Sequence, residues 1–275
     1  MKPSRVAPEL RGERLDKVVG QAAGIGRQKA RELVEHGKVT LDGKPVRLSS
    51  HRVQGGEVLR VAYRVEEKAP PKVRILHEDA ALLVVEKPAG LPSEPTRDPR
   101  RPSVLGAFER AVGLPHRLDL DTSGVLVLAK TQEALAALNA AFESRRARKV
   151  YEALVHGALE GERTIESFLA PAGSRAGKER FGSVRSGGKK AITLVRLLRA
   201  EGERTRVECE PQTGRTHQIR VHLAEAGHPI VGDELYGAPA GEHDRLGRFL
   251  LHARVLEVEH PLTGESVRFE SPVPF

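Results

Sequence analysis

The chain has 275 residues, 39% of them hydrophobic, which is enough to bury one large core and one small one. Its net charge of +8 favours an anionic partner. A single cysteine, Cys209, excludes an internal disulfide framework and a multi-cysteine zinc site, and no apolar run has the length of a membrane helix or the pattern of a signal peptide. These features predict a cytoplasmic protein.

The N-terminal quarter carries most of the excess charge. Residues 1–68 contain 15 Lys and Arg against 9 Asp and Glu, or +6, which leaves +2 for the remaining 207 residues. The apolar spacing predicts two short helices separated by Gly24 and Gly26. Their apolar faces are Leu15, Val18, Val19 and Ala22 in the first helix, and Ala30, Leu33 and Val34 in the second. A hairpin follows over residues 38–46, around the Asp42-Gly43 turn, and then a strand over 57–63.

A basic stripe follows the polar side of the second helix, formed by Arg27, Lys29 and Arg31 with Lys38 beyond it. Such a stripe can lie along a phosphate backbone, or it can be a solvated helix face. Residues 66–72, EEKAPPK, are charged and proline-rich and are expected to be a linker. We therefore expect domains at 1–65 and 73–275.

From Val73 onwards the pattern changes to many short strands. They are expected at residues 81–85, 125–130, 150–156, 191–198, 205–210, 250–257 and 266–270. Helices are expected at 132–144, behind a Thr131 N-cap, and at 216–226. Few strands alternate with helices, so the fold class is α+β with a mainly antiparallel sheet. Neither a GxGxxG nor a P-loop pattern occurs, and no nucleotide cofactor is expected.

Residues 171–190, PAGSRAGKERFGSVRSGGKK, are glycine-rich and basic. They are expected to form a long hairpin or a flexible loop. As a hairpin they could lie as a strap over RNA phosphates, and as a loop they would be surface without function.

The segment 116–124, HRLDLDTSG, places carboxylates, hydroxyls and a basic residue directly before an apolar strand. It is typical of an active-site loop, but a structural turn in which Asp121 bonds local backbone fits as well. Spacing does not choose between Asp119 and Asp121. A hydrolase could be assembled from Ser123, His116 and Asp121, although the G-x-S-x-G elbow is missing.

The segment 214–223, GRTHQIRVHL, opens a helix with Arg220 on its polar side. His217 and His222 are five residues apart with no acidic ligand between them, which disfavours a metal site. We expect them to bond substrate or backbone.

Two resemblances follow from these strings. The order RLDK, GxxRxxA and ExGxVxxDGxxV over about residues 12–63 resembles an S4-type RNA-binding module, which favours the RNA-binding interpretation of the basic stripe. The rest of the chain resembles the RluA family of RNA pseudouridine synthases. The matching strings are ALLVVEKPAGL (81–91), HRLDLDTSGVLVLAKT (116–131), KVYEALVHG (149–157), GKKAITLVRLL (188–198), QTGRTHQIRVHLAEAGHPIVGDELYG (212–237) and LLHARVLEVEHPLTGE (250–265).

The resemblance implies an isomerase that turns uridine into pseudouridine, with no metal and no cofactor. It selects Asp119 over Asp121 as the catalytic carboxylate and implies Tyr151 and Arg220 beside it. An arginine next to a carboxylate favours its charged form. Arg117 is expected to fill the gap left by a flipped base, or else to contact a phosphate. Further RNA contacts are expected from His116, Lys87, Lys149, Lys189, Arg215 and His217, and from Arg27, Lys29 and Arg31 in the N-terminal module.

The chain departs from its relatives after Leu91. Residues 92–115 are proline-rich and mix acidic residues with Arg97, Arg100 and Arg101, where relatives usually have a His-Pro-Gly-like turn. This difference weakens the inference of a particular RNA target site from the relatives. The attached S4-type module favours large-subunit ribosomal RNA as substrate, with tRNA as the alternative. A non-catalytic RNA-binding or ribosome-assembly factor is the second class of function. We expect a monomer.

Overall fold

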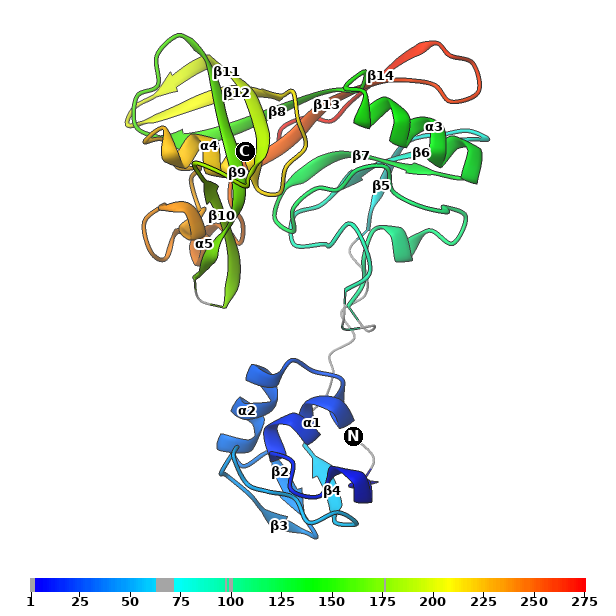
Figure 1. The fold of residues 1–275 in the computed structure, drawn as a ribbon, viewed down its shortest axis with the longest axis vertical. Coiled ribbons are helices and arrows are strands. Elements are labelled where there is room, and N and C mark those ends of the chain that lie inside the picture. Colours follow the sequence, from blue (N-terminus) through cyan, green and yellow to red (C-terminus); the bar gives the residue numbers. More distant parts are fainter. Residues whose placement is uncertain (1–2, 63–71, 97, 99–100, 176) are drawn as a thin grey trace. The chain divides into compact units, whose positions relative to one another are not determined.

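The computed structural model describes residues 3–62, 72–96, 98, 101–175 and 177–275. These form two compact units, which are Met1–Pro70 with Pro95–Pro102, and Pro71–Glu94 with Ser103–Phe275 (Figure 1). Apart from Lys72, the expected linker at 66–72 lies outside the described residues, as do Arg97 and Arg100. The domain limits of 1–65 and 73–275 stay a prediction.

The N-terminal unit packs two helices on a small sheet. The helices are α1 (Leu15–Ala23) and α2 (Arg27–Glu35), preceded by the 3-10 turn η1 (Pro8–Leu10). The sheet has the order β1-β4-β2-β3, with bounds β1 (Ser4–Arg5), β2 (Val39–Leu41), β3 (Lys44–Pro45) and β4 (Val58–Val61). Asp42 and Gly43 both have positive φ, 48° and 81°, which is the geometry of the predicted hairpin turn.

The predicted apolar faces of both helices lie in this small core, with one exception. Ala22 is exposed and Ala23 is buried instead. Ala23 follows Val19 by four residues and therefore continues the same face, and α1 ends directly after it at Gly24, which is left-handed with φ 60°.

The second unit is built on one ten-stranded sheet of order β10-β9-β11-β12-β8-β13-β7-β6-β5, with β14 paired to β13. The strands are β5 (Arg74–Glu78), β6 (Leu82–Lys87), β7 (Ser123–Ala129), β8 (Arg148–His156), β9 (Glu162–Arg175), β10 (Lys178–Ser183), β11 (Lys189–Glu201), β12 (Arg204–Pro211), β13 (Leu251–Glu259) and β14 (Ser266–Glu270). Among the described strands, β7 and β13 form the one parallel pair and the other pairs are antiparallel. The predicted α+β class is confirmed.

Helices are few in this unit. They are α3 (Gln132–Glu143), α4 (Gln218–Glu225) and the short α5 (Glu242–Leu246), with 3-10 turns η2 (Leu105–Ala107) and η3 (Glu234–Tyr236). The predicted N-cap is confirmed, because Thr131 Oγ1 accepts the N–H of Ala134 at 3.1 Å. The helix α4 starts two residues later than predicted because His217 has a left-handed backbone, with φ 55°. The basic segment after 171 is the hairpin β9–β10, not an irregular loop.

Two apolar clusters cover opposite faces of the sheet. Helix α3 packs Ala134 and Leu138 against alternate residues of β6, β7 and β13. Helix α4 packs Ile219 and Leu223 in a cluster that contains Tyr151 of β8. Since side chains alternate along a strand, the face of β8 and β12 opposite to α4 is left for polar residues.

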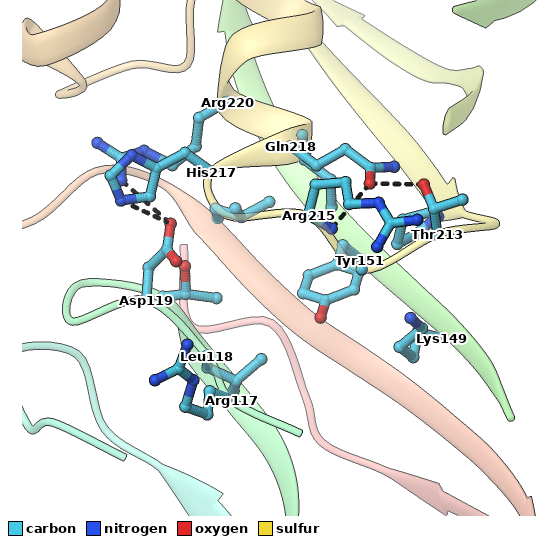
Figure 2. A pocket seen from close by; sticks show the side chains of 15 residues that line it. Arg117, Leu118, Asp119, Lys149, Tyr151, Thr213, Arg215, His217, Gln218 and Arg220 are labelled. Carbon is cyan, nitrogen blue, oxygen red and sulfur yellow. Dashed lines mark hydrogen bonds and ion pairs between the residues drawn. The ribbon is translucent and has the colours of Figure 1, made fainter. Parts of the chain in front are cut away.

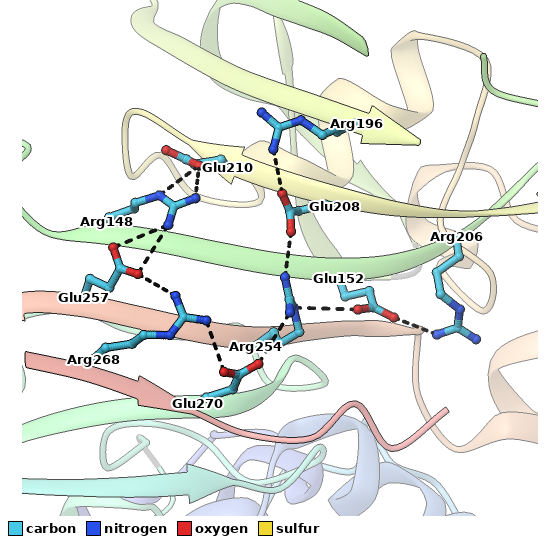
Figure 3. Close-up of polar contacts among 10 residues, drawn as sticks. All are labelled: Arg148, Glu152, Arg196, Arg206, Glu208, Glu210, Arg254, Glu257, Arg268 and Glu270. Atoms are coloured by element: carbon cyan, nitrogen blue, oxygen red, sulfur yellow. Dashed lines mark hydrogen bonds and ion pairs between the residues drawn. The ribbon is translucent and has the colours of Figure 1, made fainter. Parts of the chain in front are cut away.

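That opposite face carries a ladder of ion pairs across five strands (Figure 3). Arg254 of β13 lies at its centre, with Nη2 2.6 Å from Glu208, Nη1 3.4 Å from Glu270 and Nε 3.7 Å from Glu152. The ladder consists of Arg148, Glu152, Arg196, Arg206, Glu208, Glu210, Arg254, Glu257, Arg268 and Glu270. Five arginines meet five glutamates, so the ladder itself carries no net charge.

Replacing Arg254 by Gln should destabilise the protein by about 1–3 kcal/mol, because three carboxylates lose their shared cation. Salt screens the remaining carboxylate repulsion, so the deficit should shrink as salt is added. Thermal unfolding at low and high salt measures both effects. Arg268→Gln is the control, since the Arg268 side chain is 48% exposed, and it should cost less than about 0.5 kcal/mol. Equal losses in the two variants would contradict a central role of Arg254.

Candidate active site

A pocket of about 100 Å³ lies between the loop before β7, the strand β8 and the start of α4 (Figure 2). The predicted site residues that line it are Arg117, Asp119, Lys149, Tyr151, Arg215, His217 and Arg220. Segments far apart in the sequence therefore meet at one place. Lys87, His116 and Lys189 are not among the residues that line it.

The loop that carries Asp119 is fixed where it enters β7. Gly124 has φ 116°, and a Cβ atom there would lie 2.1 Å from the carbonyl oxygen of Ala253. A side chain is therefore excluded at the point where β7 and β13 pair in parallel. Just before it, the N–H of Thr122 donates to the carbonyl oxygen of Asp119 at 3.2 Å, which closes a turn around the carboxylate.

Lys87 holds this loop from inside the protein. Its side chain is fully buried, and Nζ donates to the carbonyl oxygens of Pro88, Leu91 and Leu120 at 3.0, 2.7 and 2.9 Å. The three N–H groups of the Lys87 ammonium are thus matched by three carbonyl acceptors. One of these acceptors belongs to Leu120, the loop residue next to Asp119. Burial lowers the pKa of Lys87 to about 7. This placement contradicts the expectation that Lys87 contacts RNA.

Arg220 links two carboxylates. Its Nη1 donates to Asp119 Oδ2 at 3.1 Å, and its Nε and Nη2 donate to the two oxygens of Asp233 at 2.7 and 2.9 Å. The guanidinium lies 4.8 Å from the ring centre of Tyr236 and 4.4 Å from that of Phe249. The Arg220 side chain is 7% exposed, and the carboxylates raise its pKa against the opposing effect of burial. A permanent cation is thus fixed beside Asp119.

One carboxylate oxygen of Asp119 is left open toward the pocket. Its side chain is 27% exposed, and among the described residues its contacts fall on Oδ2, which leaves Oδ1 without a partner. Tyr151 lines the same pocket from β8 and is 9% exposed. Burial raises the pKa of Tyr151, and the charge of Asp119 adds to this, so the phenol is neutral.

His217 is held by Tyr236. The Tyr236 hydroxyl accepts the N–H of Phe181 in β10 at 3.0 Å, so its own proton is directed to Nδ1 of His217, 2.8 Å away. A neutral ring then carries its proton on Nε2, which lies 4.0 Å from Asp119 Oδ2. Burial lowers the pKa of His217, which favours this neutral form.

Gln218 orders the wall that holds Arg215. Its Oε1 accepts the Thr213 hydroxyl at 2.6 Å and the Arg215 N–H at 3.1 Å, while its Nε2 donates to the carbonyl oxygen of Ile192 at 2.9 Å. Arg215 Nε donates to the carbonyl oxygen of Lys190 at 2.9 Å. The arginine is therefore fixed at the rim by both its backbone and its side chain.

The hydrolase interpretation is contradicted, because its three residues have other partners. Ser123 is 4% exposed and bonds His252 Nδ1 at 2.7 Å. His116 stacks on Phe142 with ring centres 4.6 Å apart and accepts the N–H of Val127 at 3.3 Å, and burial lowers its pKa to about 3. Asp121 Oδ2 lies 3.0 Å from His243 Nε2. The packing of His116 is accounted for without an RNA contact.

The remaining predicted RNA contacts are mostly exposed. Arg117 is 68% exposed and pairs with Glu94 at 3.1 Å, and Lys189 is exposed on β11. Lys149 is half-buried at the pocket, and burial lowers its pKa. Arg27, Lys29 and Arg31 belong to the N-terminal unit and lie 3.5, 2.9 and 2.7 Å from Asp16, Glu32 and Glu35.

His222 is not a ligand. It is fully buried, with Nδ1 2.8 Å from the Thr193 hydroxyl and Nε2 3.0 Å from that of Ser167. It therefore bonds side-chain hydroxyls, where substrate or backbone was expected. The sequence reasoning also missed Asp233, Tyr236, Phe249 and Gln218. Asp233 and Tyr236 belong to the matched string GDELYG. The string alone does not show that Asp233 pairs with the buried Arg220.

Comparisons with known proteins agree with this geometry. Residues 81–225 match the family of RNA pseudouridylate synthases, and residues 13–59 match the S4 domain. The chain is 35% identical to ribosomal large subunit pseudouridine synthase D of Vibrio vulnificus, over 96% of this chain and 88% of that protein. It is 37% identical to the protein of the same name from Xanthomonas campestris, over 96% and 86%.

A similar structure is known as well. The human protein RNA pseudouridylate synthase domain containing 1 superposes with a TM-score of 0.63 at 30% identity, covering 74% of this chain and 84% of that one. The resemblance drawn from the sequence strings is confirmed, and so is the S4-type module.

Lys87→Met should change how stability depends on pH. Between pH 7 and about 10 the unfolded chain binds a proton at this lysine that the folded protein has released, so folding gains up to about 1.4 kcal/mol per pH unit from this group. The free energy of unfolding of the wild type should therefore rise relative to that of Lys87→Met as pH increases through this window. Below pH 7 the two pH profiles should be parallel. Urea unfolding across the window measures this.

Lys190→Met, at an exposed position of β11, is the control and should follow the pH profile of the wild type. Parallel profiles for wild type and Lys87→Met over the whole window would show that burial of Lys87 does not displace its proton.

Proposed function

The chain belongs to the family of RNA pseudouridylate synthases, and on this basis we propose that it isomerises specific uridines of large-subunit ribosomal RNA to pseudouridine. The relatives named ribosomal large subunit pseudouridine synthase D align with 96% of this chain, so the likeness includes both units. The S4 domain adds a second surface for structured RNA. tRNA is the alternative substrate, and no feature of the described residues favours it.

The reaction needs a charged group that is close to the sugar and excluded from bulk water. The bond from C1′ to N1 of uracil breaks, the base turns, a bond from C1′ to C5 forms, and the C5 proton is lost while N1 gains one. No oxidant, reductant or energy source is consumed. One carboxylate can start this, either by attack on the sugar or by removal of the 2′ proton.

The observation that carries the proposal is the ion pair of Asp119 with the buried Arg220. Arg220 places a fixed cation 3.1 Å from the carboxylate, and Asp233 holds Arg220 in place. Oδ1 of Asp119 is left to meet the sugar. A pure RNA-binding factor would gain nothing from a buried cation aimed at a carboxylate, which argues against the non-catalytic alternative.

Tyr151 supports the base. Its ring lies in the pocket wall, where it can stack on uracil and hold it while the base turns. Because its pKa is raised, its hydroxyl stays protonated, so it assists loss of the C5 proton by hydrogen bonding to the water or carboxylate that accepts that proton.

A uridine within folded RNA must leave its stack to reach Asp119, at a cost of a few kcal/mol. Arg117 is mostly exposed, lies two residues before Asp119 and lines the same pocket, which supports a role in filling the gap in the RNA, with a phosphate contact as the alternative. Arg215 and Lys149 at the rim, Lys189 on β11, and Arg27, Lys29 and Arg31 in the S4 domain supply phosphate contacts.

The chain acts as a monomer in the cytoplasm in this proposal, and the location fits an RNA substrate and a single cysteine that cannot form an internal disulfide. Within the described residues, no helix combines the length and apolar character needed to span a bilayer.

Asp119→Asn should reduce pseudouridine formation by about 10³-fold or more while the Kd for RNA changes less than about threefold, because affinity comes from phosphate contacts. Asp121→Asn is the matched control, since Asp121 lies two residues away and pairs with His243 instead. It should keep activity within about tenfold.

The measurement is pseudouridine mapping of total RNA from strains that lack the gene and are complemented with each variant. Loss of one or a few ribosomal pseudouridines, restored by wild type and Asp121→Asn but not by Asp119→Asn, supports reaction and substrate together. If pseudouridines were lost from tRNA alone, tRNA would be the substrate in place of ribosomal RNA. An unchanged map would refute the proposal.

A further inference from the structure

His217 presents an N–H donor to the pocket that has no hydrogen-bond partner among the described residues. The residue lines the pocket from the turn before α4, and its side chain is 19% exposed. Its Nε2 atom is 4.0 Å from Asp119 Oδ2, which is too far for a hydrogen bond. Figure 2 shows the ring and the Asp119 carboxylate facing each other. The donor is therefore aimed at the place where a substrate must meet Asp119.

One arrangement of protons pairs every group in the chain of contacts from β10 to His217. The backbone N–H of Phe181 can only donate, so the Tyr236 hydroxyl accepts it at 3.0 Å. Tyr236 is 5% exposed, and within the described residues the one acceptor for its own proton is His217 Nδ1, 2.8 Å away. A neutral ring that accepts at Nδ1 carries its proton on Nε2. Tyr236 thus determines which nitrogen faces the pocket as a donor.

The backbone of His217 also points to a function of its side chain. Its φ is 55°, in the left-handed region, which is unfavourable for a residue with a side chain. The helix α4 begins only at the next residue, Gln218. Glycine would adopt this backbone without strain, so the turn itself gives no reason for an imidazole here.

We propose that His217 donates its Nε2–H to the uracil carbonyl oxygen next to the ring atom that is bonded to the sugar, and that Tyr236 is the positioning residue that keeps this donor neutral and in place. The inference rests on the proposed function in taking uridine as the substrate. It adds a group that hydrogen-bonds the base while the base is detached.

The chemistry of uracil explains why one donor is enough. When the bond from C1′ to N1 breaks, its electron pair goes to the base, and the negative charge is shared by N1 and the carbonyl oxygens O2 and O4. O2 is the oxygen beside N1. A half turn of the ring about the line from N3 to C6 exchanges N1 with C5 and O2 with O4. A fixed donor therefore meets O2 before the turn and O4 after it, and stabilises the detached base in both positions without giving up its proton.

A charged ring would fail in this role. An imidazolium would pair with Asp119 Oδ2 and so occupy the carboxylate that must react. Burial lowers the pKa of His217, and the hydrogen bond from Tyr236 favours the neutral ring further because it uses the lone pair that a proton would take. The charged groups around His217 and Tyr236 are Asp119 before β7, Glu179 and Arg180 in β10, Arg220 in α4 and Asp233 before η3. Of these, the carboxylates oppose the effect of burial and Arg220 adds to it.

The first test replaces the donor. Single-turnover rates of pseudouridine formation are measured with enzyme in saturating excess over large-subunit ribosomal RNA from a strain that lacks the gene. His217→Leu should lower the rate constant about 10²-fold and leave the Kd for the RNA within about threefold, because it removes a donor to a developing anion. His217→Gln keeps an N–H donor and should recover about tenfold of that loss.

A rate constant of His217→Leu within about threefold of the wild type would overturn the proposal. A loss confined to Kd would also overturn it, because His217 would then be an RNA contact and not a donor to the reacting base.

The second test removes the Tyr236 hydroxyl and keeps the ring over Arg220. In Tyr236→Phe the pKa of His217 should rise, so the rate should fall as pH drops and His217 gains charge. We expect a rate about tenfold below the wild type at about pH 6 and within about threefold of it at about pH 8. Ser183→Ala is the matched control, since the Ser183 hydroxyl also ties β10 to α4, through Glu225, without touching His217. A Tyr236→Phe profile that matches the Ser183→Ala profile would overturn the role of Tyr236.

Nitrogen NMR of the wild-type chain with isotope-labelled histidine checks the tautomer without any reaction. The signals that disappear in His217→Gln belong to His217, and at about pH 7 they should show a bare Nδ1 and a protonated Nε2. A proton on Nδ1 would overturn the proposal. A wild-type protein that forms no pseudouridine in any RNA would refute the proposed function, whereas an active wild type with an equally fast His217→Leu would refute this inference alone.

Discussion

The catalytic unit depends on keeping Arg220 charged while nearly all of its side chain is out of water. Such a cation is stable only where acids meet it with good geometry. Asp233 takes two of its donors and the rings of Tyr236 and Phe249 cover its faces, so that one amino group remains for Asp119. The buried groups of the site therefore determine where its more exposed groups lie. The position of Asp119, the proposed catalytic carboxylate, follows from a cation that the fold has already fixed.

Asp119 is brought to that cation by a loop whose backbone is held on both sides. The parallel pairing of β7 with β13 brings two backbones so close that Gly124 alone fits, and the loop enters the strand at that point. Lys87 closes the other side by bonding the carbonyl oxygen of Leu120. These are backbone constraints, which explains why the loop sequence contains a glycine and why a lysine is found where no solvent reaches it.

The sequence predicted elements that depend on local pattern. Alternating strands, the Thr131 cap and the Asp42-Gly43 turn were found because neighbouring residues determine them. The meeting of Asp119 with Arg220 needed the family resemblance, because 101 positions separate them. Lys87 was misassigned as an RNA contact because the family resemblance implied a basic cleft around the Asp119 loop. Its burial follows from three carbonyl groups that no local pattern reveals.

Both units use a buried acid to orient an arginine, but the remaining partner differs. In the catalytic unit Asp233 leaves Arg220 facing another carboxylate of the same chain, so the charge is satisfied before substrate arrives. In the S4 domain Asp16 leaves guanidinium donors without a partner among the described residues. The outer face of the sheet cancels its own charges. Within the described residues, the same pair of groups, a buried acid and an arginine, therefore leaves no net demand for a further anion in the one unit and leaves unpaired N–H donors at the surface of the other.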